Sequence, residues 1–314
     1  MISIWQTDNP KQKTPCLIKA GSFVFVILLG IFLRKINFFK ETDFQLLSKI
    51  TLRITLAASI FVSFASKKID RSLLAVTLLS MGLGAIYMVI GYLRNRSKSR
   101  EQQAFEILNL PGYNIGCFTM PFAQGFLGPI GVIVTSLFDV GNACICLGTS
   151  YSVASMIKYG SRFSLSRIFK SLFRSVPFVC YITAASMNLL NIQTPQIVVE
   201  YAKIIADANA FIAMLMIGVG FKIEGDRTQL VYIARFLLIR YGIAAIFSLI
   251  FYFCLPFALE IRQTLAILPF SPFSVAIPGF TGELKEDVGL SSAINSISIV
   301  VSIVIMMVLL IVLL

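Results

Sequence analysis

The chain has 314 residues, of which 57% are hydrophobic and 13% are charged, and its net charge is +12. Soluble domains average about 45–50% apolar and about 25% charged residues, so this composition excludes an ordinary water-soluble fold and a disordered chain. The positive charge does not indicate nucleic-acid binding, because Lys and Arg lie in short loops between apolar segments, as in integral membrane proteins. The sequence contains no histidine, and neither a metal site nor another cofactor is predicted.

Ten apolar segments follow one another along the chain, and each is long enough to cross a bilayer as a helix of roughly 20 residues. They comprise residues 16–33, 45–65, 73–93, 104–126, 130–156, 168–190, 198–221, 231–255, 263–282 and 290–313. The polar stretch 1–15 before them has no small-residue cleavage site after the first apolar run, so it is predicted to be a tail and not a cleaved signal. The sequence therefore predicts an all-α polytopic membrane protein with ten transmembrane helices.

The fourth and ninth segments differ from the others by prolines and glycines near their middles. The fourth contains Pro121, and the ninth contains Pro272 and Pro278. A proline within a span deletes a backbone hydrogen bond, and in lipid such a break persists only where it is buried in protein or lines a wet cavity. The two breaks lie five segments apart, which predicts two inverted five-helix repeats of the kind found in secondary transporters. The alternative is that these prolines only kink ordinary spans.

The distribution of basic residues predicts the orientation of the two halves. The first repeat comprises residues 16–156, and a basic linker, 157–167, joins it to the second repeat, 168–314. Sixteen Lys and Arg residues lie in the loops on the linker side and seven in the loops on the other side. Basic loops stay in the cytoplasm, so the linker is predicted to be cytoplasmic and both termini, including the tail 1–15, non-cytoplasmic. The cell membrane is the predicted location, and the basic residues from Lys158 to Arg174 are interpreted as a topological signal that meets anionic lipid.

The stretch from Gly112 to Ala143 resembles the fourth and fifth helices of the auxin efflux carrier family. The matching residues are Asn114, Gly116, Pro121, Gly125, Gly128 and the run Phe138-Asp139-Val140-Gly141-Asn142. Further similarity lies in Gly30 to Arg34, in the amphipathic linker 38–49, in Leu56-Ala57-Ala58 and in Ile217 to Phe221, so that it covers nearly the whole chain. The sequence departs from the family where Ala57 replaces a proline of the second helix.

The resemblance implies a fold of ten helices in two inverted repeats, in which broken helices four and nine cross in a transport domain. It also implies export or import of small organic anions, such as auxins in plants and dicarboxylates in some bacteria. The substrate site is then expected near mid-membrane, where the breaks at Pro121 and at Pro272 to Pro278 cross.

Asn114 is the first candidate for substrate binding. It precedes Pro121 by seven residues, two helical turns, so both lie on nearly the same face, close to Gly116. The Asn amide offers two donors and one acceptor, which suit a carboxylate or a freed carbonyl. The alternative is that Asn114 caps the helix after Pro111 and Gly112, since Asn is a preferred cap.

The ninth segment supplies the other substrate-binding candidates, Ser271, Pro272, Ser274 and Pro278. Neither broken segment has a central Lys or Arg, so an anion is expected to be held by backbone N–H groups and neutral donors. The two serine hydroxyls are suitable donors, although the alternative is that they bond back to helix carbonyls.

Four further polar residues are candidates for ion coupling or for structural support: Asp139, Asn142, Asp207 and Asn209. Asp139 and Asn142 share a helix face, and a carboxylate within a span costs about 3 kcal/mol and marks an interior position. It either binds a coupling proton or cation or holds helix four in place. Asp207 either pairs with Lys203 four residues earlier or faces the substrate cavity together with Asn209.

These features predict a secondary transporter of efflux-carrier type for a small organic anion, working by alternating access. The alternative is a membrane sensor or scaffold that retains the carrier fold without net transport. An enzyme is not predicted, because no nucleophile–base pair is visible. The expected partners are the anion and the lipid bilayer and no nucleic acid, while coupling to a proton or cation and assembly as a homodimer are left open.

Overall fold

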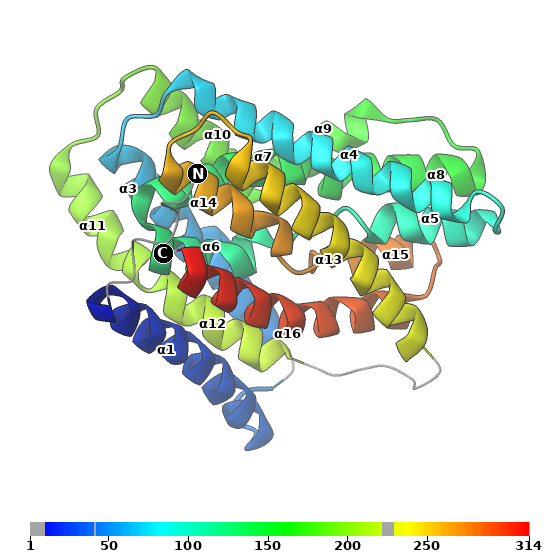
Figure 1. The fold of residues 1–314 in the computed structure, drawn as a ribbon, viewed down its shortest axis with the longest axis horizontal. Coiled ribbons are helices and arrows are strands. Elements are labelled where there is room, and N and C mark those ends of the chain that lie inside the picture. Colours follow the sequence, from blue (N-terminus) through cyan, green and yellow to red (C-terminus); the bar gives the residue numbers. More distant parts are fainter. Residues whose placement is uncertain (1–9, 41, 222–228, 314) are drawn as a thin grey trace, which may run out of the picture.

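The computed structural model describes residues 10–40, 42–221 and 229–313, and every regular element within them is a helix (Figure 1). Six helical stretches there are long and apolar enough to cross a membrane: Asp43–Ser66, Arg71–Asn95, Ile115–Tyr159, Gln196–Gly220, Leu230–Phe253 and Val288–Leu313. A seventh results if Leu165–Arg174 and Val176–Leu189, which meet at 83°, form one bent span. The chain is therefore a polytopic all-α membrane protein, as its composition predicts.

The first half of the chain is helical from Pro10 to Tyr159, with short interruptions. Its elements are α1 (Pro10–Lys35), α2 (Asp43–Ile50), η1 (Thr51–Thr55), α3 (Leu56–Ser66), η2 (Arg71–Leu74), α4 (Ala75–Asn95), α5 (Arg100–Asn109), η3 (Ile115–Thr119), α6 (Met120–Phe122), η4 (Ala123–Leu127), α7 (Gly128–Cys144), η5 (Ile145–Thr149) and α8 (Ser150–Tyr159). Four of these, η1, η3, η4 and η5, are single π-helical turns. The stretch Ile115–Tyr159 would measure about 68 Å if straight, but Gly128, with φ 63°, turns the chain between η4 and α7.

The second half contains α9 (Leu165–Arg174), α10 (Val176–Leu189), α11 (Gln196–Asp207), α12 (Asn209–Gly220), α13 (Leu230–Phe253), α14 (Leu259–Ile267), η6 (Leu268–Phe270), α15 (Ile277–Glu283) and α16 (Val288–Leu313). The sixth and the first apolar segments differ from the sequence prediction. The sixth apolar segment, 168–190, is not one helix, because the chain bends at Ser175. The first helix begins at Pro10 rather than at residue 16, and residues 1–9 of the predicted tail lie outside the described residues.

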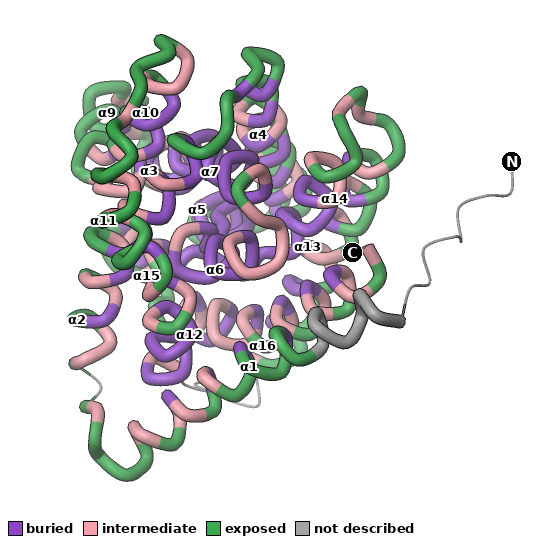
Figure 2. Tube along the Cα trace, turned by 90° about the vertical axis from the view of Figure 1, so that its left-hand side faces the viewer, coloured by how far each residue is buried: buried purple, intermediate pink, exposed green. Residues whose placement is uncertain are grey.

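Helix α7 runs through the centre of the molecule, and its residues from Gly131 to Ala143 are all buried (Figure 2). The outer helices show the opposite arrangement to a soluble protein. On α16 the small polar residues Ser298 and Ser302 are buried, whereas Val304 and Val308 are exposed. This is the arrangement expected of a helix that packs through small residues and turns its branched apolar side chains toward lipid.

Helices α1 and α12 pack side by side at two glycines (Figure 1). A Cβ atom on Gly30 would lie 2.6 Å from the Leu215 carbonyl oxygen, and one on Gly218 would lie 2.1 Å from that of Ile27. The Arg34 side chain then donates hydrogen bonds to the carbonyls of Val219 and Phe221, at 3.1 and 2.9 Å. Two motifs that carry the family resemblance, Gly30 to Arg34 and Ile217 to Phe221, therefore meet in space.

We predict that Gly30→Ala destabilises the protein by about 1–3 kcal/mol, because the added methyl group meets backbone atoms that cannot move aside without separating the helices. Gly21→Ala is the matched control on the same helix, since a Cβ there has no heavy atom within 4 Å. Thermal unfolding in detergent measures both variants. Equal melting temperatures for Gly30→Ala and Gly21→Ala would contradict the close approach of α1 and α12.

Candidate functional site

The fourth apolar segment is broken at Pro111 and Gly112, and not at Pro121 as predicted. Helix α5 ends at Asn109, and residues 110–114 are irregular before η3 begins. A residue that precedes a proline disfavours the helical conformation. A Cβ on Gly112 would lie 3.1 Å from the side chains of Cys146 and Ile277, so the chain passes close to both at this point. Pro121 lies instead inside continuous helix, between the π-helical turns η3 and η4, where wider turns accommodate its missing N–H group.

The ninth segment is broken over residues 271–276, between η6 and α15. This break lies against the first one. The Asn114 backbone N–H donates to the Pro272 carbonyl at 2.9 Å, and the Thr119 hydroxyl donates to Ser271 Oγ at 2.7 Å. The Ser271 hydroxyl donates in turn to the Leu268 carbonyl at 2.7 Å, which is the back-bonding alternative for this residue. We name residues 110–119 and 268–276 together the crossing.

Asn142 on α7 replaces the helix partners that the first break removes. Its Oδ1 accepts a hydrogen bond from the Tyr113 N–H at 3.0 Å, and its Nδ2 donates to the Tyr113 carbonyl at 3.0 Å. The same Nδ2 donates to Asp139 Oδ1 at 2.8 Å, and the Tyr181 hydroxyl donates to Asp139 Oδ2 at 2.9 Å. Asn142 therefore holds helix four in place, and Asp139 connects this arrangement to α10.

A pocket of about 250 Å³ lies between the crossing and the helices η1, α7 and α10. Five of the predicted site residues line it, and they are Asn114, Gly116, Asp139, Asn142 and Ser274. Six others do not line it, namely Pro121, Ser271, Pro272, Pro278, Asp207 and Asn209. Pro272 contributes through its carbonyl to the crossing, and Pro278 lies in the first turn of α15.

The Asn114 side chain is the buried amide of this pocket that remains available to a ligand. The residue is only 6% exposed, and among the described residues its side chain has no hydrogen-bond partner. It occupies the position that caps η3, but its side chain makes no capping hydrogen bond, so the capping alternative is wrong. The next residues, Ile115, Gly116 and Cys117, also line the pocket, and N–H groups in a first helical turn lack acceptors within the helix.

Two arginines that are not among the predicted site residues lie at the mouth of the pocket. Arg53 comes from η1 and Arg174 from the end of α9, and both are exposed residues of the pocket lining. Arg53 lies inside the second apolar segment, where a count restricted to loops misses it. Arg174 belongs to the basic region interpreted as topological. The guanidinium groups place positive charge where a solute would enter.

A third arginine, Arg240 on α13, is fully buried behind the pocket. Its Nη1 donates to the Leu110 carbonyl at 2.6 Å, and its Nη2 lies 3.3 Å from the Gly112 carbonyl. The fourth and ninth segments have no central basic residue, as the sequence shows, but the eighth segment supplies one to the crossing. The run 231–255 contains Arg235 near its start and Arg240 further in, and the inner position of Arg240 was the signal that could have found it, since intramembrane charges mark functional interiors.

Asp207 and Asn209 lie away from the pocket. Asp207 is exposed, and the Lys203–Asp207 ion pair of the alternative reading is not formed, since the pairs among described residues are Arg94–Glu106, Lys158–Glu286 and Arg167–Glu283. Asn209 is buried and structural. Its Oδ1 accepts from the Thr55 hydroxyl at 2.9 Å, and its Nδ2 donates to Gln124 Oε1 at 3.1 Å.

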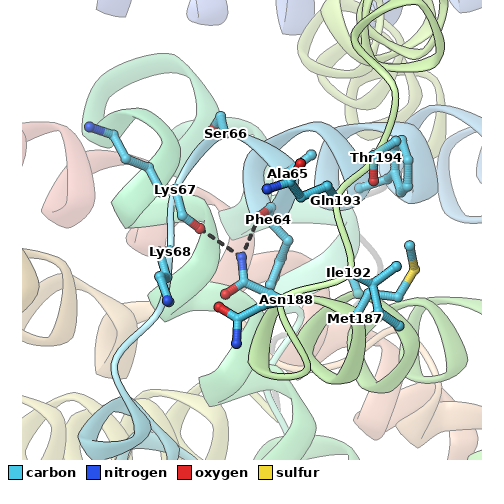
Figure 3. A pocket seen from close by; sticks show the side chains of 13 residues that line it. Phe64, Ala65, Ser66, Lys67, Lys68, Met187, Asn188, Ile192, Gln193 and Thr194 are labelled. Atoms are coloured by element: carbon cyan, nitrogen blue, oxygen red, sulfur yellow. Dashed lines mark hydrogen bonds between the residues drawn. The ribbon is translucent and has the colours of Figure 1, made fainter.

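A larger pocket of about 420 Å³ lies at the end of α3 and beside the loop after α10 (Figure 3). Its central amide is already fully used. Asn188 donates to the carbonyls of Phe64 and Lys67, at 2.5 and 2.7 Å, and accepts from the Ile69 N–H at 3.0 Å. The adjacent Lys67 and Lys68 are exposed. The Asn188 side chain therefore anchors the loop after α3. The pocket at the crossing differs, because it retains a buried amide without a partner.

Neither any family model nor any curated protein matches this chain. The geometry of the crossing and the pocket beside it is therefore the basis for a functional proposal.

Proposed function

We propose that the protein is a secondary carrier for a small organic anion, such as a carboxylate, and that the pocket at the crossing is its substrate site. The observation that carries the proposal is the buried, unpartnered amide of Asn114 in a pocket between two helix breaks. Arg53 and Arg174 at the mouth favour an anion on approach, and the amide and first-turn N–H groups of η3 are donors for a carboxylate. A volume of about 250 Å³ suits a small molecule.

We further propose that ten membrane-crossing segments form two inverted repeats in which helices four and nine cross. In this plan α5 with η3 to η4 is the broken helix four, and α14 with α15 is the broken helix nine. The resemblance to auxin efflux carriers supports the same plan, and so does the position of both breaks in corresponding segments of the two halves. Alternating access then moves the crossing relative to the surrounding helices.

Asp139 gives this carrier a means of coupling to protons. Its carboxylate lines the same pocket as Asn114, so its negative charge opposes the binding of an anion. A proton bound by Asp139 removes that repulsion, and proton and anion are then taken up together. An inward-directed proton gradient is expected to stimulate uptake in the wild-type protein and not in Asp139→Asn.

Proteoliposome uptake tests the proposed function. A thermal-shift screen of organic acids first identifies a ligand, because binding to the native state raises its apparent stability. The purified protein is then reconstituted, and the labelled ligand is followed into the vesicles. Saturable uptake that excess unlabelled ligand competes away supports a carrier. Binding without equilibration across the bilayer identifies a sensor and would overturn the proposal.

The orientation predicts which loops an impermeant thiol reagent can reach. In a cysteine-free background, Ser97→Cys lies in the basic loop after α4 and Ser66→Cys at the last residue of α3, next to the loop that follows it, and both positions are exposed. We expect labelling of Ser66→Cys from outside intact cells and labelling of Ser97→Cys only after permeabilisation, because basic loops stay in the cytoplasm. The reverse result would invert the predicted topology.

A further inference from the structure

Arg240 is a buried charge bound by neutral groups. The residue is 0% exposed, and among the described residues no ion pair involves it. Three aromatic rings surround the guanidinium, with its central carbon 4.4 Å from the centre of the Tyr87 ring, 3.9 Å from Tyr113 and 4.9 Å from Phe273. Ring faces attract a cation, most strongly where water is excluded.

The carbonyl groups that bind Arg240 are ones that the helix break leaves without a partner. In a continuous helix the Leu110 carbonyl would accept from the N–H four residues later, that of Asn114. Here the Asn114 N–H donates to the Pro272 carbonyl instead, so the Leu110 carbonyl needs another donor. Nη1 of Arg240 supplies it at 2.6 Å, and Nη2 approaches the Gly112 carbonyl at 3.3 Å.

The position of the Arg240 guanidinium has the chemistry of a cation site. It lies at the carboxyl end of α5, where the helix dipole is negative and unpaired carbonyl oxygens accumulate. In secondary transporters, unwound carbonyls and the C-terminal ends of half-helices coordinate the coupling cation, whereas anionic substrate groups lie at half-helix N-termini. Both ends are present at this crossing. The N-terminal end of η3 lines the pocket, and the C-terminal end of α5 holds Arg240.

We propose that the Arg240 guanidinium is the resident cation of the crossing, and that it occupies on α5 the place that a bound monovalent metal ion takes at comparable helix breaks. The crossing then assembles without Na⁺ or K⁺ at this position. The inference rests on the proposed function, because the coupling cation is a property of a carrier. Its test uses protein stability without substrate, so that its failure and the failure of the transport proposal are distinguishable.

The experiment compares wild-type protein with Arg240→Lys, Arg240→Met and Arg240→Ala in detergent, each in choline, sodium and potassium chloride at equal ionic strength. The wild-type melting temperature is expected to be the same in all three salts. Arg240→Ala and Arg240→Met are expected to melt roughly 5–10 °C lower, because the Leu110 and Gly112 carbonyls lose their donor. Arg240→Lys keeps a cation and is expected to lose less than half of that amount.

Chemical rescue separates a cation site from an ordinary packing role. Millimolar methylguanidinium chloride is expected to reverse at least about half of the decrease in melting temperature of Arg240→Ala, because it fills the space that the guanidinium leaves between the three aromatic rings. It is expected to leave the melting temperature of the wild type unchanged. Sodium or potassium that restores Arg240→Ala equally well also supports the proposal.

Three results would overturn it. The first is an Arg240→Met protein as stable as the wild type, which would show that the charge is dispensable. The second is an Arg240→Ala protein that folds but responds to no cation. The third is a wild-type melting temperature that is higher in Na⁺ or K⁺ than in choline, with the same difference in Asp139→Asn. This comparison does not need the alanine variant, so it tests the proposal even if that variant does not fold.

Discussion

Replacing Asn142 by alanine is expected to cause a large loss of stability at the crossing. The side chain makes three hydrogen bonds, to the Tyr113 N–H, to the Tyr113 carbonyl and to Asp139. Its removal leaves buried groups unpaired, each at a cost of about 1–3 kcal/mol. Thermal unfolding in detergent, together with the amount of protein inserted in the membrane, measures the effect.

Asn95→Ala is the matched control for this prediction. Asn95 is also buried, but the hydrogen bond from its amide is to the Gly91 carbonyl of its own helix. The control is expected to lose about 1 kcal/mol, the value of a typical single hydrogen bond. If the two variants unfold at the same temperature, Asn142 does not hold the first helix break.

Replacing Asn114 by aspartate is expected to abolish anion binding, because the change keeps the shape of the side chain and places a negative charge in the pocket. Asn114→Ala is expected to weaken binding about 10–100-fold, since a hydrogen bond to a charged group contributes about 1.5–3 kcal/mol. The fold is expected to survive both changes, because the Asn114 side chain has no hydrogen-bond partner among the described residues. Ligand titration of the purified variants gives the dissociation constants.

The same pair of variants determines the sign of the substrate's charge. A cationic ligand would bind Asn114→Asp more tightly than the wild type, which would contradict an anion carrier. Asn95→Ala, remote from the pocket, controls for general effects of losing a buried amide and is expected to bind with wild-type affinity. Unchanged affinity in Asn114→Ala would remove Asn114 from the substrate site.

The sequence predicted the all-helical membrane fold because hydropathy is summed over whole segments and does not depend on tertiary contacts. It placed one break at Pro272 to Pro278, where residues 271–276 are irregular and Pro278 already lies in α15, and it assigned the other break to Pro121. Pro121 and Pro272 look alike in sequence. The turns around Pro121 widen into η3 and η4, which is a property of packing that no local pattern encodes. The true break lies at Pro111-Gly112, a dipeptide that is itself a local turn signal.

The charged groups near the pocket show a second limit of sequence reasoning. Basic residues were counted in loops, so Arg53 and Arg240, each inside an apolar segment, were not assigned a role. Only one contact of the network from Asn142 through Asp139 to Tyr181 could be predicted from the sequence. Asn142 and Asp139 lie three residues apart, so their shared helix face follows from local spacing. Tyr181 lies 42 residues from Asp139 along the chain, and its contact depends on how α10 packs against α7.

The bend at Ser175 has a consequence for the lipid around the protein. Helix α10 has 14 residues, so it is about 21 Å long, whereas the hydrocarbon layer is about 30 Å thick. In the proposed ten-segment plan α10 crosses the bilayer, and α9 does not lengthen that span because it turns away by 83°. The bilayer beside α10 would then thin at a cost of fractions of a kcal/mol per Å of mismatch. Arg174 and Pro177 line the pocket at this same end. A local indentation of the bilayer there would bring water closer to the pocket, which makes membrane thickness itself a variable that tunes access to the site.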